Sequence, residues 1–410
     1  MIELLSPAGD FEKLRAAVRY GADAVYLAGE SFGMRAASGN FTDNELAEAV
    51  AFAHGKGVKI YVTVNVMPRT DEYPALRTYL GTLARIGVDA VIVSDVGVLM
   101  LVKEVAPSLE IHISTQASAV SAAACTAWYH LGASRVVLAR ELTMSEIVAI
   151  RKNTPPELEL EAFIHGAMCI AYSGRCLLSN YFIGRDANHG RCAQPCRWIY
   201  NERVITEEKR PDDRIVIEEH DGDSFVMSSR DTCMIEHIPA LMEAGITSLK
   251  IEGRVKSAYY TAVVTNTYRM AIDAYLADPA GYTYDPVWKR ELESVSHREY
   301  HTGFYFTPPH ESANTVTAPG YIREKAYLAT AETDSDADGR VTFVQRNKLV
   351  SGAPMELLTP GKAGIPFVGT DMRDEAGEPI ESAPHPLMRF SMVVPVPVKA
   401  GDIIRAGGEE

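Results

Sequence analysis

The side chains best suited to chemistry are five of the six cysteines, which all fall between residues 169 and 233. Their spacing, C-x6-C-x15-C-x3-C-x36-C, contains no CxxC pair of the kind on which structural zinc sites usually rest. Thiolates gathered from separated loop positions are compatible with an iron–sulfur cluster, whose ligands need only converge in space. The spacing therefore favours a metal or cluster site, and scattered inert thiols are the alternative.

Two of the cysteines have distinctive local surroundings. Cys125 lies in the alanine-rich run 121–125 and is predicted to be a small buried helix residue. Residues 228–231, Ser-Ser-Arg-Asp, are typical of a helix N-cap, which would put Cys233 in the first turn of a helix. The helix dipole favours the thiolate form of a cysteine at that position, so Cys233 is predicted to be one of the metal- or cluster-binding cysteines.

The segment from Cys169 to Tyr200 is a basic, aromatic island in a chain of net charge −14. Its charged side chains are four arginines and one aspartate, interleaved with aromatic residues. This mixture suits phosphate contacts combined with stacking on a flipped or single-stranded base. The alternative is that the arginines balance an anionic cluster. The residues predicted to bind RNA are Arg175, Arg185, Arg191, Arg197 and Trp198.

Polar side chains at the ends of predicted strands are the other candidates. The predicted catalytic residues are His112, Gln116, Arg140, Glu141, Glu161, His165, Glu252 and Arg254. Arg140 and Arg254 could clamp the carboxylates of a small organic acid. His112 or His165 could move protons. For any one of them the alternative is a structural role, such as a buried ion pair between Glu252 and an arginine.

A recurring phrase in the sequence predicts the scaffold that positions these residues. A helical pattern, a glycine and a buried strand recur with strands in residues 21–27, 57–62, 87–93, 132–138 and 245–251. Runs near 3–5, 111–113 and 158–164 bring the count to eight strands, each followed by an amphipathic helix. The predicted fold class is α/β, a (β/α)8 TIM-type barrel. A doubly wound open sheet is the alternative, because periodicity cannot show closure.

A long excursion separates the seventh and eighth predicted strands. It covers residues 165–246 and holds all five clustered cysteines, so they should meet at the active face of the barrel. The predicted domains are a barrel over 1–277 with a cluster-binding insertion at 165–246, a linker and extension over 278–315, and a small all-β barrel domain over 316–410. This last domain is predicted either to support the barrel or a dimer, or to bind RNA.

Composition excludes several classes of protein. With 47% hydrophobic and 23% charged residues, the chain is neither disordered nor fibrous. Its longest apolar stretch, 88–102, is interrupted by Asp89 and Asp95 and is too short to span a membrane. Because no signal-peptide pattern is present at residue 1, we expect a cytoplasmic protein without a membrane partner. The charge argues against a general basic surface for nucleic acid, and homo- or hetero-oligomers remain open.

Residues 161–179, EAFIHGAMCIAYSGRCLLS, resemble the long signature of the collagenase-like U-type peptidase family. LSPAG at 5–9, ARE at 139–141, KIEGR at 250–254 and SHR at 296–298 also resemble that family, so the resemblance covers about residues 1–305. It implies an oxygen-independent hydroxylase with a four-iron four-sulfur cluster. The ligands implied by the resemblance are Cys169, Cys176, Cys192 and Cys233, with Cys196 as the alternative ligand.

The branches of this family differ in substrate. One hydroxylates the ubiquinone ring, one makes 5-hydroxyuridine at the wobble position of tRNA with prephenate implicated, and one hydroxylates an rRNA cytidine. Quinone-type members resemble the barrel alone, whereas tRNA-modifying members carry an added β domain, as this chain does. The resemblance therefore implies a tRNA hydroxylase, with tRNA as partner and prephenate, a small organic acid, as co-substrate.

Other functions remain as alternatives. They are a hydroxylase of a small aromatic or quinone precursor, an rRNA hydroxylase, a collagenase-like peptidase and a zinc-stabilised RNA-binding module without chemistry. For a peptidase the sequence offers neither HExxH nor GxSxG. Cys169 with His165 is the only nucleophile pair that we consider for it.

Overall fold

The computed structural model of the chain describes residues 2–34, 39–187, 190–198, 228–309, 311, 314–316, 321–322 and 325–407. Four more strands are described by backbone pairing only: β8 (Ile205–Glu207) pairs with β9 (Arg210–Ile215), and β10 (Glu219–His220) with β11 (Asp223–Ser224). In the part of the chain so described, no helix is long and apolar enough to cross a membrane.

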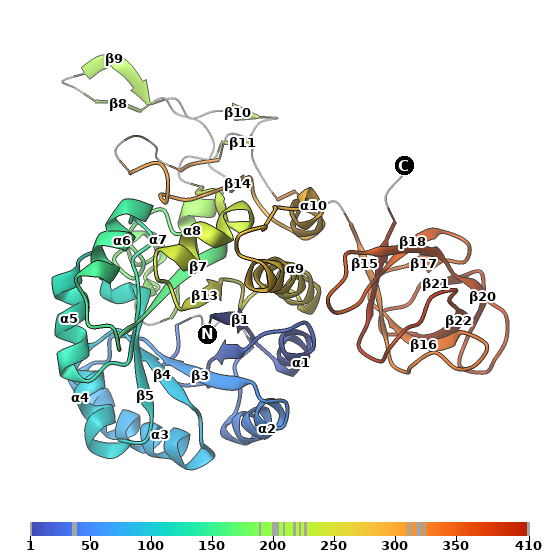
Figure 1. The fold of residues 1–410 in the computed structure, drawn as a ribbon, viewed down its shortest axis with the longest axis horizontal. Coiled ribbons are helices and arrows are strands. Elements are labelled where there is room, and N and C mark those ends of the chain that lie inside the picture. Colours follow the sequence, from blue (N-terminus) through green and yellow to red (C-terminus); the bar gives the residue numbers. More distant parts are fainter. Residues whose placement is uncertain are drawn as a thin grey trace. The chain divides into compact units, whose positions relative to one another are not determined.

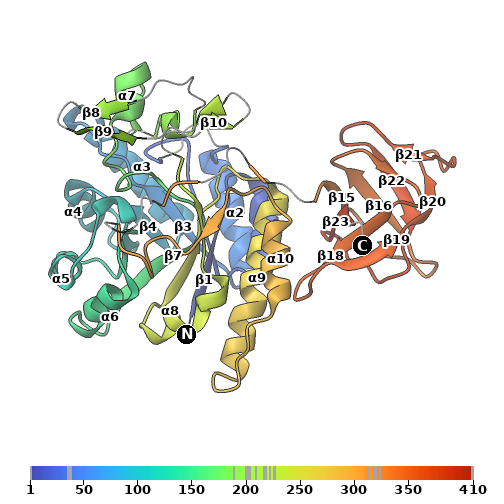
Figure 2. The same cartoon turned by 90° about the horizontal axis from the view of Figure 1, so that it is seen from above.

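Eight parallel strands, all within the described residues, close into a barrel (Figures 1 and 2). Around the ring they are β1 (Glu3–Pro7), β2 (Ala24–Leu27), β3 (Lys59–Val64), β4 (Ala90–Val93), β5 (Glu110–Ile113), β6 (Arg135–Val137), β7 (Glu159–Ala167) and β13 (Ser248–Ile251). β13 pairs in parallel with β1 on one side and with β7 on the other. The ring is therefore closed, which confirms the predicted TIM-type barrel and excludes the open sheet.

Helices alternate with these strands along the chain. They are α1 (Phe11–Arg19), α2 (Asp43–His54), α3 (Tyr73–Ile86), α4 (Val96–Val105), α5 (Ala122–Leu131), α6 (Met144–Lys152), α8 (Ile238–Glu243) and α9 (Ala258–Ala277). Gly87 and Gly132, which follow α3 and α5, have φ of +85° and +108°, as the glycine of the repeated phrase predicts. Thr42 and Thr143 cap α2 and α6 in capping boxes. Local signals thus set the helix boundaries.

The inner side chains of the first strands form one buried cluster. It comprises Leu5, Ala24, Tyr26, Tyr61, Ala90 and Ile92, which come from β1 to β4. The outer side chains of these strands are buried as well, since every residue of β2 and β4 is buried. Strands covered on both faces explain why the sequence reads as continuous apolar runs rather than as alternating ones.

The excursion after β7 returns to the barrel through a short strand. It contains α7 (Leu178–Ile183), and β12 (Asp231–Cys233) pairs antiparallel with the end of β7 and parallel with β14 (Tyr300–His301). The prediction that Cys233 lies in the first turn of a helix is wrong, because Cys233 is the last residue of β12 and the helical segment begins at Ile235 with a 3-10 turn that leads into α8 at Ile238. β7 runs on to Ala167, and its extra backbone groups pair with residues 231–233 in place of the predicted helix cap.

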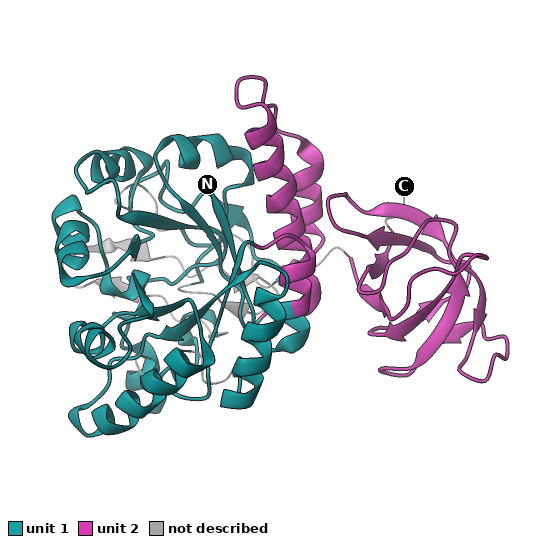
Figure 3. Cartoon of the chain, turned by 60° about the horizontal axis from the view of Figure 1, so that its bottom comes forward, with its two compact units in different colours: residues 1–14, 23–255, 297–321 teal, residues 15–22, 256–296, 322–410 magenta. Residues whose placement is uncertain are grey.

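The chain forms two compact units, which Figure 3 colours separately. One comprises residues 1–14, 23–255 and 297–321, and the other 15–22, 256–296 and 322–410. The predicted boundaries 1–277, 278–315 and 316–410 divide the chain consecutively, whereas the two units interleave along it.

The second unit contains the predicted all-β domain, which the structure confirms. Its described part is a seven-stranded antiparallel half-barrel sheet in the order β19 (Ile365–Val368), β18 (Pro354–Leu358), β23 (Ile403–Ala406), β15 (Tyr327–Ala331), β16 (Arg340–Gln345), β22 (Arg389–Val393) and β20 (Thr370–Arg373). Two short strands, β17 (Leu349–Val350) and β21 (Ser382–Ala383), pair beside it. Phe343, Phe390 and Met392 lie in its buried core.

A buried ion network joins this domain to helix α10 (Pro286–Glu293) within the second unit. The Arg405 side chain is 1% exposed and donates from Nη2 to Glu291 and from Nε to Glu356, both at 2.7 Å. Lys325 pairs with Glu356 at 2.5 Å. Because removing one partner of such a network strands a buried charge, α10 and the β domain are held as one folded body.

Candidate active site at the mouth of the barrel

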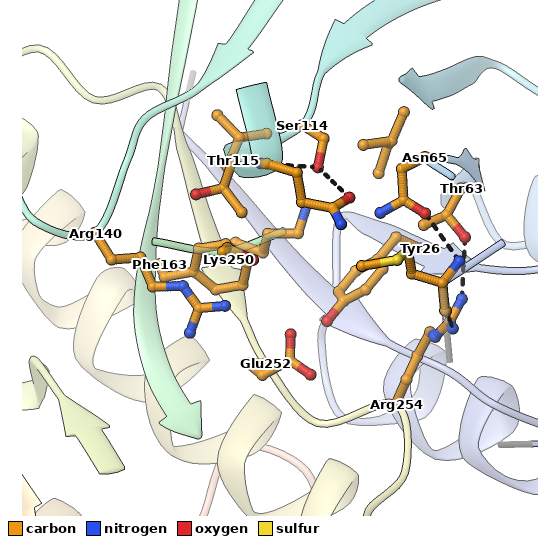
Figure 4. Close-up of a pocket in the computed structure, with 15 residues that line it drawn as sticks. Tyr26, Thr63, Asn65, Ser114, Thr115, Arg140, Phe163, Lys250, Glu252 and Arg254 are labelled. Carbon is orange, nitrogen blue, oxygen red and sulfur yellow. Dashed lines mark hydrogen bonds between the residues drawn. The ribbon is translucent and has the colours of Figure 1, made fainter. Parts of the chain in front are cut away.

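A cavity lies at the C-terminal ends of the barrel strands (Figure 4). Its polar lining residues are Thr63, Asn65, Ser114, Thr115, Gln116, Ser173, Arg140, Lys250, Glu252 and Arg254. Its volume is about 70 Å³. One water needs about 10–15 Å³ of such space, so the cavity has room for a small polar molecule or for part of a larger one. Of the predicted catalytic residues, Gln116, Arg140, Glu252 and Arg254 lie here.

Arg140 is held in the cavity by neutral groups. Its Nη1 donates to the carbonyl oxygen of Ala167 at 2.7 Å, and its guanidinium carbon lies 4.0 Å from the centre of the Phe163 ring. Among the described residues, its Nε is buried without a hydrogen-bond partner and no carboxylate pairs with the side chain. A guanidinium placed in this way attracts an anion, because carboxylates and phosphates match its fork of donors.

Beneath the cavity, the barrel interior holds a saturated charge network around Arg135. This side chain pairs with Glu3 and Glu159 at 2.5 Å and with Glu161 at 3.1 Å. Lys250, which lines the cavity, pairs with Glu161 at 2.6 Å. Burial alone would raise the pKa of Glu161, but Lys250 and Arg135 outweigh it and lower this pKa to about 2. Such a carboxylate is a poor proton acceptor near neutral pH, so the position of Glu161 suits structure better than catalysis.

His112 belongs to the same interior layer. Its ring is fully buried and meets Tyr61 edge to face, with 4.6 Å between ring centres. Its Nε2 lies 3.5 Å from Glu110. Burial lowers the pKa of His112, so the neutral imidazole is the favoured form. The structure therefore brings His112 close to Arg135 and does not place it among the residues that line the cavity.

Arg254 anchors the loops around the cavity opposite Arg140. Its side chain is buried, donates from Nη1 to Thr63 Oγ1 at 3.0 Å, and donates from Nη2 to the carbonyl of Met34. A Cβ on Gly9 would lie only 2.5 Å from the carbonyl oxygen of Arg254, so no larger residue fits there. The opening LSPAG motif thus supports the loop that carries Arg254. Figure 4 shows Glu252 between Arg140 and Arg254.

His165 is turned away from the cavity by an irregularity in the sheet. Lys250 is the register partner of Phe163, but Ile251 is the partner of His165, so one residue of β7 is extra. His165 therefore faces the same side as Ile251, outside the barrel. There its Nε2 lies 3.4 Å from the Tyr300 hydroxyl, and the ring of His297 stacks on Tyr300 with 4.1 Å between centres.

Glu141, the remaining predicted catalytic residue, follows Arg140 and does not line the cavity. Burial raises the pKa of its carboxyl group. The carboxyl group lies close enough to Tyr172 to raise the pKa of that hydroxyl, together with the effect of burial. Glu141 therefore lies beside the cysteine-bearing segment rather than in the cavity.

Four of the clustered cysteines gather near one another. Cys169, Cys176, Cys192 and Cys196 are half-buried thiols, and Cys233 is buried. Burial raises the pKa of Cys196, and the other three thiols raise it further, whereas Arg197 opposes them. Within the described residues, however, no three Cys, His, Asp or Glu side chains are close enough to hold a metal ion. The donor types fit an iron–sulfur cluster, but the thiols do not stand at ligand distances.

The segment 169–176, which we call the cysteine strap, reaches the cavity. Its turn closes through a hydrogen bond from the Arg175 N–H to the Tyr172 carbonyl at 3.0 Å, and Ser173 lines the cavity. Gly174 has φ +75°, and a Cβ there would lie 3.1 Å from the Cβ of Gln116. Only glycine allows this turn to pack so closely on Gln116, and the strap thereby forms part of the cavity wall.

Apolar side chains of the basic island are exposed on and beside α7. Tyr181 is 83% exposed, and Leu177 and Phe182 are also exposed. Phe182 lies near Trp198, with 6.3 Å between ring centres. Rings presented to solvent beside arginines form a surface on which bases can stack.

The predicted RNA-binding arginines take several positions around these rings. Arg185 Nε donates to the Arg191 carbonyl at 2.9 Å, and Arg197 donates to the Gln194 side chain. Arg175 lies 3.5 Å from the Ser118 hydroxyl, at the edge of the barrel. All of these arginines belong to the excursion that follows β7.

Some cavity residues were not predicted. Thr63 and Asn65 follow the apolar run of β3, and Tyr26 and Met34 belong to β2 and its loop. The rule that selected Arg140, polar residues at strand ends, applies equally to Thr63 and Asn65. The sequence therefore contained the information needed to select Thr63 and Asn65, because residues 60–65 read Ile-Tyr-Val-Thr-Val-Asn, an apolar strand pattern with polar residues at its end.

Comparison of the sequence with known proteins finds a family whose two models match most of the chain. A model described as "Peptidase family U32" matches residues 9–315, and one described as "Peptidase family U32 C-terminal domain" matches residues 323–405. The "tRNA hydroxylation protein P1" of Bacillus subtilis is 38% identical over 415 residues, covering 99% of this chain and 94% of that protein. The 23S rRNA 5-hydroxycytidine synthase of Escherichia coli is 39% identical, covering 68% of this chain and 40% of that protein. An uncharacterized protease of Methanocaldococcus jannaschii is 42% identical, covering 75% and 73%.

Proposed function

The chain belongs to peptidase family U32, and on that premise we propose that it is an RNA-modifying enzyme that hydroxylates tRNA. The observation that carries this proposal is the match to the Bacillus subtilis tRNA hydroxylation protein, which extends over the barrel and the β domain alike. The match to the rRNA hydroxylating enzyme covers only 40% of that protein, so it supports RNA hydroxylation in general and favours rRNA less.

The finer proposal is formation of 5-hydroxyuridine at the wobble position without molecular oxygen. Replacing a ring C–H bond by C–OH removes two electrons from the ring. Without molecular oxygen, the oxygen donor or a separate electron acceptor must take up both electrons, one at a time if they pass through a redox cluster. Thiols of Cys169, Cys176 and Cys192 would hold a four-iron four-sulfur cluster, with Cys233 as the fourth ligand and Cys196 as the alternative. Such a cluster supplies one-electron redox chemistry when bound.

The residues of the cavity would bind and orient the small molecules of the reaction. Arg140 offers an uncompensated cation for a carboxylate, which supports the proposal that prephenate is the organic acid used. Lys250, in contrast, is neutralised by Glu161 and keeps the cavity floor in place. Ser173 joins the strap to the same cavity, so the acid would lie beside the cysteine-bearing segment.

The basic island would hold the RNA. We propose that Tyr181 and Phe182 stack on unpaired bases of the tRNA loop, while Arg175, Arg185 and Arg191 contact its phosphates. This binding is local, in keeping with the net charge of −14 for the whole chain.

Analysis of tRNA nucleosides from cells that lack the gene tests the function. We expect loss of 5-hydroxyuridine-type nucleosides, restored by the wild-type gene but not by Cys176→Ala or Arg140→Met. Unchanged nucleosides, in a strain without a second gene of this family, would contradict the proposal. Normal tRNA with an accumulated unhydroxylated aromatic precursor would favour the quinone-type alternative.

Metal content tests the cluster independently of the substrate. Protein purified without oxygen should contain about four irons and four acid-labile sulfides per chain, and Cys169→Ala should lose them. Zinc alone, with gelatin cleavage that Cys169→Ala abolishes, would favour the peptidase instead.

A further inference from the structure

Arg140 connects the cavity to the start of the cysteine strap. The Ala167 carbonyl that it binds at 2.7 Å lies two residues before Cys169. That end of the strap is also fastened by a hydrogen bond of 2.5 Å from the Ser229 hydroxyl to the Met168 carbonyl. A displacement of the Arg140 side chain would therefore release one of the bonds that position the strap.

The strap touches the cavity a second time, at its turn. Ser173 lines the cavity, and Gly174 packs against the side chain of Gln116, which is 5% exposed. Gln116 accepts a hydrogen bond from Ser114 at 3.2 Å through Oε1, and its amide nitrogen has no partner among the described residues. The Gln116 amide nitrogen is therefore a hydrogen-bond donor without an acceptor among the described residues, at the point where the turn of the cysteine strap meets the cavity.

The guanidinium of Arg140 has one nitrogen engaged and two nitrogens without partners among the described residues. Nη1 binds Ala167, whereas neither Nε nor Nη2 has a hydrogen-bond partner in the described part of the chain. A buried N–H without a partner costs about as much as a lost hydrogen bond, so a ligand that supplies an acceptor is favoured. The Nε and Nη2 pair presents two parallel donors, which match the two oxygens of a carboxylate.

We propose that a small carboxylate anion bound to the Nε–Nη2 edge of Arg140 locks the cysteine strap over the barrel mouth. The anion fixes the guanidinium, which holds Ala167 at the start of the strap, and it reaches Gln116, on which the turn of the strap rests. Binding of the anion and ordering of the strap then stabilise each other, because coupling between two sites is reciprocal.

A carboxylate fits this cavity better than phosphate does. Glu252 lines the same cavity as Arg140 and repels phosphate, which concentrates its charges on one group, more strongly than a carboxylate whose second charge stands apart on another carbon. The cavity of about 70 Å³ also limits the ligand to a small group. The inference rests on the proposed function only in supplying an organic acid as the natural ligand.

Amide hydrogen exchange on the full-length protein tests the coupling directly. Exchange in residues 168–176 is measured by mass spectrometry with saturating prephenate, malate or inorganic phosphate, and affinities are measured by calorimetry. We expect either carboxylate to slow exchange of the strap about tenfold or more, while exchange in residues 340–345 of the β domain stays unchanged.

Substitutions at Arg140 sharpen this test. Arg140→Met should weaken carboxylate binding at least about tenfold and abolish the protection, and Arg140→Lys should keep part of the affinity because it keeps the charge but not the fork. Arg77→Met is the control, since Arg77 pairs with Glu104 at the surface and does not line the cavity. Melting curves of each variant verify that it is folded.

Several results would overturn the inference. They are carboxylate binding that Arg140→Met leaves unchanged, binding without slower exchange of the strap, an effect of phosphate alone, and no effect of any anion on the wild type. Loss of tRNA hydroxylation is not among them. Intact coupling in a protein that does not modify tRNA would contradict the proposed function and leave this inference standing.

Discussion

Arg135 and Arg140 lie five residues apart, on β6 and just beyond it, and their surroundings are opposite. Arg135 is 3% exposed and pairs with three carboxylates, of which Glu161 is fully buried, Glu3 is largely buried and Glu159 is partly exposed. Arg140, at the mouth, rests on a carbonyl and an aromatic ring and pairs with no carboxylate among the described residues. Inside the barrel, Arg135 is paired with carboxylates, because an unpaired buried charge would destabilise the fold. At the mouth, Arg140 is left without a carboxylate partner within the described residues and is available to bind an anionic ligand.

The largest expected effect comes from breaking the interior network. Arg135→Met should reduce the free energy of unfolding by about 3–5 kcal/mol, because it leaves Glu3, Glu159 and Glu161 without their shared cation. Urea denaturation measures it. Arg77→Met, which removes the exposed pair with Glu104, is the control and should leave the free energy of unfolding nearly unchanged. If both variants lost the same free energy of unfolding, the buried network would stabilise the protein no more than the exposed pair does, which would contradict the prediction.

Acid should weaken the same network. The pKa of Glu161 is lowered from 4.5 to about 2, so its contribution is present above pH 4.5 and is lost as pH falls from about 4.5 towards 2. The size is on the order of 3 kcal/mol. His112, whose pKa is also lowered, adds a loss that begins as pH falls below 6.5.

Unfolding free energies measured from pH 7 to pH 3.5 test the acid dependence. Glu161→Gln should show a shallower fall below pH 4.5 than the wild type, because the substituted side chain does not titrate. The same slope in both proteins would show that another group accounts for the acid sensitivity.

At the rim of the excursion, exposed rings should affect RNA affinity and leave folding unchanged. Tyr181→Ala should weaken binding of a tRNA anticodon-loop RNA by about 1–2 kcal/mol, since this ring is 83% exposed and free to stack on a base. Fluorescence anisotropy measures it. Tyr321→Ala, an exposed tyrosine outside the excursion, is the control and should bind RNA normally. An equal loss in both variants would argue against a stacking site on α7.

The smallest expected effect on stability is at the mouth itself. Arg140→Met should lower the free energy of unfolding by about 1 kcal/mol or less, because only the hydrogen bond to Ala167 and the ring contact are lost. Placed beside Arg135→Met in the same urea experiment, it measures the contrast between the two arginines. A loss of about 3 kcal/mol or more would mean that Arg140 is structural.

The barrel could be predicted because its signals are local. The glycine that ends a helix and the apolar run that follows it recur along the chain, and Gly87 and Gly132 have the left-handed conformation that the pattern predicts. The strand-end rule also selected Arg140 and Gln116, since closure of the barrel brings all strand ends to one face.

Non-local features could not be predicted. An extra residue in β7 turns His165 outward, and nothing in its alternation announces the change. Cys233 follows a good helix cap but pairs with the end of β7 instead, because an open sheet edge was available. Arg405 and Glu291 are 114 residues apart, so local sequence patterns could not predict their pairing. For the same reason they could not predict that the two units interleave along the chain.

The second unit begins with residues 15–22 and ends with the last strand of the chain. Within it, Arg19 pairs with Asp402 at 2.5 Å and the Tyr20 hydroxyl donates to the Leu358 carbonyl at 2.9 Å. During synthesis the end of the first helix must therefore wait for residues made almost four hundred positions later, and a ribosome that stops early leaves this helix without its partners. Until the residues around Leu358 and Asp402 have been made, this end of the helix lacks its partners, which favours binding of the growing chain by chaperones.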